Sequence, residues 1–258
     1  MINPLQPIGA ALIGITQTAG RISFFAGTAI GNGFLGPIYW RQMLRQMVEI
    51  GFYSLPVVGL TAIFTGMVLA LQSYTGFSRF EAESAVATIV VLSMVRALGP
   101  VLAGLMVAGR VGAAMAAELG TMRVTEQIDA LTTLSTDPLR YLVFPRLVAG
   151  LITLPLLVVV ANVIGVMGGY LVGVHKLGFG PVEYLNRTFE FLEMQDVVSG
   201  LAKAAVFGFL IALMGCYHGY HSKGGAQGVG AATTHAVVSA SILILTANYF
   251  ITQAFFSR

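Results

Sequence analysis

Five stretches of this chain are long, apolar and nearly free of charge. A helix needs about 20 apolar residues to cross a hydrocarbon core of about 30 Å. Each stretch is also apolar around its whole circumference, so it is buried in lipid or protein on every side. The sequence therefore predicts an all-α integral membrane protein with five transmembrane helices, at Ile50–Leu71, Ala85–Gly109, Leu147–Val174, Val197–Tyr217 and Ala236–Phe256.

The overall composition agrees with this fold class. Only 10% of the 258 residues are charged, whereas a soluble domain carries about 25%. A formal net charge of +3 without a basic run argues against a nucleic-acid partner. The single cysteine, Cys216, excludes a disulfide within the chain.

The N-terminal segment Leu5–Trp40 is glycine-rich and has polar residues interspersed among its apolar ones. We interpret it as a helix lying in the membrane interface, with a sixth span as the alternative. The predicted organisation is an N-terminal interfacial region, residues 1–48, and a transmembrane domain, residues 49–258, with a cytoplasmic segment at 110–146.

Basic residues predict the orientation, because they concentrate on the cytoplasmic side. The side of the N-terminus and of segment 110–146 holds Arg41, Arg45, Arg110, Arg123, Arg140, Arg146 and Lys223, against Arg79, Lys176, Arg187 and Arg258 opposite. This asymmetry places the N-terminus in the cytoplasm and, with five spans, the C-terminus outside.

No catalytic constellation is evident. Gly224–Gly230 is rich in glycine but lacks the Lys-Ser/Thr of a phosphate-binding loop, so we read it as a flexible turn. Cys216, His218 and His221 could bind zinc, although an interfacial cap on a helix is the simpler interpretation. We therefore expect no enzyme activity, metal or cofactor in this chain, and any ATP hydrolysis would belong to another chain.

Two basic residues fall within the predicted spans. Arg96 lies about 17 Å from Ala85 at 1.5 Å per residue, and Lys203 lies about 10 Å from Asp196. No acidic residue within a span is expected to neutralise them. Such charges usually face an interior or a wet cavity, which would suit an amphiphile with an anionic head. Alternatively, Arg96 bonds carbonyls freed near Pro100 and Lys203 extends outward to the interface.

The segment after the second span has a second distinctive pattern. Ala113–Leu119 is predicted to extend that span as a helix. Thr125 can then cap a short helix with an acidic first turn, which carries Ile128, Leu131 and Leu134 at three-residue spacing and ends at Asp137-Pro138. This pattern indicates either a docking helix for a partner or a plain interfacial loop helix.

Several motifs in this region carry a resemblance. They are GRVGA at Gly109–Ala113, AELGTMR at Ala117–Arg123, TEQIDAL at Thr125–Leu131, Asp137-Pro138 and Pro145-Arg146. GMVLALQ at Gly66–Gln72 and LSMVRALGP at Leu92–Pro100 add to them. From about Arg41 onward the chain resembles the MlaE permease family.

The resemblance implies a homodimeric ABC permease in the inner membrane of a Gram-negative bacterium. It implies two cytoplasmic ABC ATPases, which bind ATP and Mg²⁺, as partners. A STAS-domain accessory protein and a periplasmic hexamer of MCE-domain subunits are the other implied partners. It also implies phospholipid movement between inner and outer membranes, which maintains outer-membrane asymmetry.

Positions carried over from the family give two sets of site residues. For lipid binding in a periplasm-facing cavity they are Leu69, Gln72, Tyr74, Phe77, Arg96 and Leu98, with Lys203 and Asp196 as polar contributors. For coupling to the ATPase, within Glu118–Leu134, they are Glu118, Arg123, Glu126, Gln127, Asp129 and Leu131. Ala97 departs from the family, where Glu often follows the arginine, and so an obvious counter-ion of Arg96 is missing.

Other functional classes stay open at this point. A secondary transporter or channel for an amphiphilic anion would work alone, but the spans lack the Asp/Glu/His relay of proton coupling. No paired catalytic residues support an intramembrane enzyme. A scaffold for a periplasmic ring is the remaining alternative.

Overall fold

The computed structural model describes residues 5–36, 39–78 and 85–256, and all regular structure in these ranges is helical. The first half contains α1 (Leu5–Phe34), α2 (Trp40–Gly51), η1 (Phe52–Ser54), α3 (Leu55–Phe77), α4 (Ala85–Ser93), η3 (Met94–Leu98), α5 (Gly99–Val107), η4 (Ala108–Gly112) and α6 (Ala113–Val124). The second half contains α7 (Gln127–Thr133), η5 (Leu139–Val143), α8 (Phe144–His175), α9 (Pro181–Glu190), α10 (Met194–Tyr220) and α11 (Gly225–Phe256).

Five helical runs in the described residues are long and apolar enough to cross a membrane, which confirms the predicted number. They are Trp40–Phe77, Ala85–Val124, Leu139–His175, Met194–Tyr220 and Gly225–Phe256. Each contains one predicted stretch and extends beyond it, because helix formation continues into polar residues that hydropathy alone leaves out. The extension of the second span into α6 is confirmed.

The glycine-rich segment Gly224–Gly230 differs from the prediction. Only Gly224 and Gly225 have positive φ values, +89° and +67°, and α11 begins at Gly225. The turn is therefore confined to the first two residues, and the other glycines belong to the helix.

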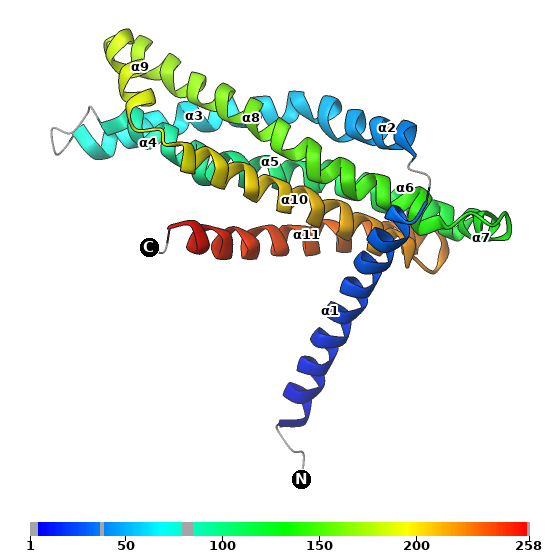
Figure 1. Ribbon diagram of the computed structural model, residues 1–258. Coiled ribbons are helices and arrows are strands. Elements are labelled where there is room, and N and C mark those ends of the chain that lie inside the picture. The colour runs from blue at the N-terminus through cyan, green and yellow to red at the C-terminus, as the bar shows by residue number, and fades with distance from the viewer. Residues whose placement is uncertain (1–4, 37–38, 79–84, 257–258) are drawn as a thin grey trace.

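Helices α8 and α10 form the centre of the bundle (Figure 1). α2 and α3 pack along α8, while α6 and α11 pack along α10. The packing is close where glycines meet: a Cβ at Gly66 of α3 would collide with the carbonyl of Gly165 of α8. A Cβ at Gly150 of α8 would lie 2.5 Å from the carbonyl oxygen of Gly208 of α10. Small residues allow such backbone contact between membrane helices.

Helix α1 leaves the bundle at the end that carries α6 and α7 (Figure 1). It is held near its C-terminal end, where Phe34 packs on Phe144 with ring centroids 5.4 Å apart and Asn32 donates a hydrogen bond to Asp137. It is not among the five candidate spans. Its place in the interface and the orientation of the chain stay predictions, and two residues of the charge count, Arg79 and Arg258, lie outside the described residues.

The start of α10 positions the site described next. Glu193 precedes the helix, and Asp196 is the third residue of its first turn. The two form a reciprocal capping box, in which the Glu193 side chain accepts from the Asp196 backbone and Asp196 Oδ2 accepts from the Glu193 N–H at 3.3 Å. Such caps satisfy orphan N–H groups at a helix start, so the helix begins before the predicted Val197.

Candidate functional site

Arg96 and Asp196 form an ion pair inside the bundle. Arg96 lies in the π-helical turn η3, and its Nε is 2.6 Å from Oδ1 of Asp196. The Asp196 side chain is only 1% exposed. The expectation that no acidic residue neutralises Arg96 was therefore wrong. It failed because α10 starts three residues before the predicted span and brings Asp196 into the helix.

Lys203 lies two helical turns further along α10 and is completely buried. Its Nζ donates a hydrogen bond of 2.6 Å to the backbone carbonyl of Arg96. Pro100 has no N–H to offer this carbonyl four residues earlier, so the lysine replaces the missing helical donor. The outward extension of Lys203 was wrong, and so was the assignment of carbonyls near Pro100 to the Arg96 side chain.

The remaining surface of the cluster is basic. It contains two basic side chains, Arg96 and Lys203, and one carboxylate, Asp196. The side chain of Arg96 is 39% exposed, and its guanidinium carbon lies 4.8 Å from the ring centroid of Phe256 in α11. An anionic group could therefore reach the exposed edge of the Arg96 guanidinium while Asp196 binds its Nε and Lys203 binds the backbone carbonyl of the same residue.

The other predicted lipid-binding residues lie apart from this cluster. Gln72 on α3 is exposed, Leu69 and Phe77 are half-buried, and Tyr74 packs on Phe179 with ring centroids 5.9 Å apart. Within the described residues, none of these four contributes a hydrogen bond or ion pair to the cluster. Leu98 borders a void of only about 10 Å³ between α3, α5 and α8.

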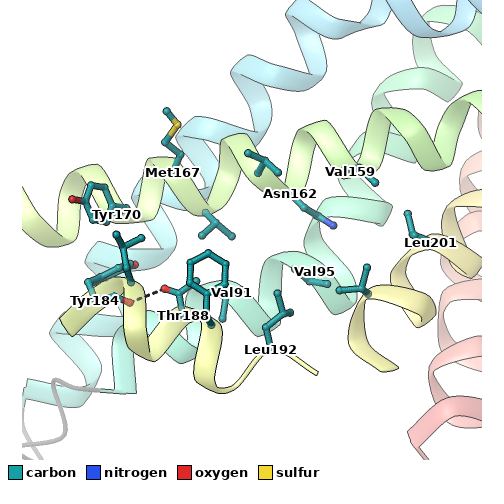
Figure 2. A pocket seen from close by; sticks show the side chains of 15 residues that line it. Val91, Val95, Val159, Asn162, Met167, Tyr170, Tyr184, Thr188, Leu192 and Leu201 are labelled. Carbon is teal, nitrogen blue, oxygen red and sulfur yellow. Dashed lines mark hydrogen bonds between the residues drawn. The ribbon is translucent and has the colours of Figure 1, made fainter. Parts of the chain in front are cut away.

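A larger cavity of about 360 Å³ lies elsewhere, between α4, α8, α9 and α10. Figure 2 shows the side chains that line it, among them Val91, Val159, Met167, Tyr184 and Leu201. None of the predicted lipid-binding residues borders it. Sequence reasoning missed this cavity because residues 176–196 lie between two predicted spans and were assigned no helix. The spacing of Tyr184 and Thr188, which face the bundle together on α9, is the signal that could have revealed the helix.

The predicted coupling residues are gathered around α6 and α7. Glu118 pairs with the buried Arg146 at 2.8 Å, and Arg123 pairs with Asp129 at 2.7 Å. Glu126 and Gln127 are exposed, and Leu131 is half-buried. These side chains present a charged surface at the end of the bundle from which α1 departs.

Three details of this segment differ from the prediction. Thr125 does not cap α7; its hydroxyl donates to the carbonyl of Thr121 in α6, and Glu126 precedes α7 in the left-handed region with φ 60°. Leu134 is 75% exposed, whereas Ile128 is buried, so the apolar stripe is shorter than expected. α7 ends at Thr133, before Asp137-Pro138.

The Cys216, His218 and His221 group has other partners. Cys216 is buried, the His218 ring bonds Ser239 at 3.1 Å, and the His221 ring bonds the carbonyl of Tyr217 at 2.8 Å. No group of three or more potential metal ligands occurs among the residues that the structure describes.

Comparison with known proteins identifies the family. The family model described as "Permease MlaE" matches residues 43–254. The chain belongs to the MlaE permease family. The resemblance seen in the sequence is thereby confirmed over most of the chain. An MlaE-family member with five candidate spans is a multi-pass membrane protein, and membership implies a permease subunit that works with a separate ATPase.

Three relatives of this MlaE-family chain span different groups of organisms. A "Probable ABC transporter permease protein" of Rickettsia bellii is 60% identical over 256 residues, covering 99% of both chains. The "Intermembrane phospholipid transport system permease protein MlaE" of Haemophilus influenzae is 33% identical, covering 99% of this chain and 98% of that one. The chloroplastic "Protein TRIGALACTOSYLDIACYLGLYCEROL 1" of Arabidopsis thaliana is 35% identical, covering 91% and 67%.

Proposed function

We propose that this MlaE-family permease moves phospholipid between two membranes as the lipid-binding subunit of an ABC transporter. The observation that carries the proposal is the basic cluster of Arg96, Asp196 and Lys203 within the membrane-spanning bundle. The name of the Haemophilus influenzae relative, which specifies intermembrane phospholipid transport, supports the same substrate class.

The chemistry of the cluster suits a phosphate head. The planar guanidinium of Arg96 offers several donors, of which Nε is engaged by Asp196. Arginine binds phosphate through charge-assisted and often bidentate hydrogen bonds. A phosphodiester at the exposed edge of Arg96 would add the second negative charge that the cluster lacks, while apolar walls hold the lipid tails.

The proposed assembly follows the family. Two copies of this permease would pair with two cytoplasmic ABC ATPases, a STAS-domain protein and a periplasmic hexamer of MCE-domain subunits. We place the complex in the inner membrane with the N-terminus cytoplasmic and the C-terminus periplasmic. The exposed charges around α7, including Glu126 and Asp129, support its role as the contact to the ATPase.

Purification in mild detergent tests the proposal. We expect an ATPase to be identified among the co-purified proteins, and phospholipid among the co-purified lipids. A permease that retains neither, or that transports an amphiphile alone along an ion gradient, would overturn the assignment.

A paired variant tests the role of the cluster. Arg96→Leu combined with Asp196→Asn removes both charges of the ion pair together, so neither of these two residues is left without its partner. Lipid occupancy by native mass spectrometry should fall several-fold, whereas Arg21→Leu, on the exposed face of α1, should leave it unchanged. Unchanged occupancy in the double variant would contradict a headgroup contact at Arg96.

A further inference from the structure

The cavity between α4, α8, α9 and α10 is open on the outer face of the bundle. Three residues at its rim are highly exposed: Val163 by 62%, Met167 by 55% and Phe189 by 71%. Behind them, Val91 and Val95 are buried and form its floor. Val163 and Met167 belong to a helical run that is long and apolar enough to span a membrane, so we expect this rim to face hydrocarbon rather than water.

The cavity has the depth of one leaflet. Along α8 its lining runs from Val159 to Tyr170, a distance of about 17 Å at 1.5 Å per residue. One leaflet contributes half of a hydrocarbon core of about 30 Å. The cavity therefore extends from the middle of the membrane to its α9 side.

The lining is apolar except at a few positions. Two polar atoms of lining residues are buried without a hydrogen-bond partner in the described part of the chain, the Tyr184 hydroxyl and Asn162 Oδ1. Both pack against glycines of the bundle, Tyr184 against Gly169 and Asn162 against Gly99. The surface that the cavity offers to a ligand is therefore apolar.

We propose that this cavity binds one acyl chain of a phospholipid from the leaflet on the α9 side. The acyl chain fills the groove toward Val159 and Leu201. Apolar cavities of this kind stay dry and take up hydrocarbon. A helix of a partner, about 10 Å wide with its side chains, is too thick to enter a cavity of about 360 Å³.

This site is separate from the proposed transport cluster. None of Arg96, Asp196 and Lys203 borders the cavity, and the residues that close it come largely from α8 and α9. A lipid held here would bridge α9 to the bundle, with its headgroup beside Tyr170 and Tyr184.

A photoactivatable lipid tests the proposal. The purified protein is reconstituted in phosphatidylcholine vesicles that contain phosphatidylcholine with a diazirine at the end of one acyl chain. After irradiation, mass spectrometry maps the labelled residues. We expect labelling to concentrate near Val159, Val95 and Leu201, several-fold above the lipid-facing residues of α11.

Two matched tryptophan variants on α8 distinguish loss of labelling caused by filling the cavity from loss caused by adding a large side chain anywhere on the helix. Val163→Trp places an indole in the cavity and should reduce this labelling several-fold. Val160→Trp adds the same group at a lipid-facing position, 40% exposed, that does not border the cavity, and should leave the labelling unchanged. Leu201→Phe provides a second filling variant should Val163→Trp fail to fold.

Three results would overturn the proposal. They are labelling spread evenly over all lipid-facing helices, equal labelling in the filled and control variants, and cross-links to a co-purified protein instead of lipid. The Arg96→Leu/Asp196→Asn variant should keep the labelling, so a failure of the transport assignment remains distinguishable from a failure at this site.

Discussion

Asp196 and Arg96 are 100 residues apart in the chain, yet Oδ1 of one lies 2.6 Å from Nε of the other. The carboxylate is buried, whereas the guanidinium is partly exposed. The backbone carbonyl of the same arginine accepts a hydrogen bond from Nζ of Lys203. One π-helical turn of the second span thus binds two side chains of the fourth span, which fixes the register between these helices.

Removing the carboxylate alone should destabilise the protein. Asp196→Asn leaves Arg96 without its counter-ion, and loss of one partner of a buried pair costs about 3–5 kcal/mol, which we lower to about 2 kcal/mol because Arg96 is partly exposed. That corresponds to a decrease of about 4–8 °C in Tm. Thermal unfolding in detergent measures it, and adding Arg96→Leu should restore part of the loss. Strictly additive effects of the two substitutions would contradict the coupling.

Close contact between α3 and α8 should make Gly66 sensitive to substitution. A Cβ there collides with the Gly165 carbonyl, whereas a Cβ at Gly76 of the same helix meets nothing within 4 Å. Gly66→Ala should therefore cost about 1–3 kcal/mol through overpacking, and Gly76→Ala should be neutral or slightly stabilising. Comparison of the two Tm values decides the matter; equal values would show that the helices separate easily.

Charge reversal at α7 should affect assembly more than stability. Asp129 pairs with Arg123 on the surface, and exposed pairs contribute about 0–1 kcal/mol. Asp129→Arg should leave Tm nearly unchanged but weaken co-purification of the ATPase at least several-fold. Glu190→Arg, which disrupts an exposed charge near Arg187 on α9, is the control. If the Asp129→Arg variant binds the ATPase normally, Asp129 is not part of the coupling surface.

Tyr184 should ionise at a higher pH than an exposed tyrosine. Burial raises the pKa of Tyr184 from 10.0 to about 12. Because the folded pKa lies above the unfolded one, the neutral phenol contributes stability below pH 10 that is lost as the pH rises through about 12. The difference in tyrosinate absorbance between wild type and Tyr184→Phe should appear only near that upper value. Ionisation of Tyr184 near pH 10 would show that α9 opens to solvent.

The positions of the membrane helices could be predicted because transfer into lipid depends on the composition of each segment. A run such as Ala236–Phe256 requires no knowledge of its neighbours to be placed in a membrane. Its ends were less well predicted, since α11 begins at Gly225, where helix formation no longer depends on lipid.

The partners of the charged residues could not be predicted in the same way. Arg96 was correctly placed within a candidate span. Asp196, in contrast, was placed before the start of the helix, and one interpretation had the Lys203 side chain extending outward to the membrane interface. Pro100 leaves the Arg96 carbonyl without its helical donor, but no sequence pattern indicates that Lys203 of another helix supplies the replacement. The cavity beside Tyr184 was missed because α9 was too short for a hydropathy signal.

The sequence by itself determined that five segments are long and apolar enough to span a membrane, that the second of them continues as a helix past its apolar stretch, and that the chain resembles MlaE permeases. Hydrophobic segments and local motifs carry this information within short stretches. Only the tertiary structure decided that Asp196 neutralises Arg96, that Lys203 is buried, and that α9 closes a cavity against α8. These contacts depend on how closely small residues let the helices approach. A Cβ at Gly200 of α10 would lie 2.5 Å from the carbonyl oxygen of Val95, and one at Gly173 of α8 would lie 2.6 Å from the ring of Tyr184 in α9. Such distances are set by all the side chains at a contact together, so no single segment of the sequence encodes them.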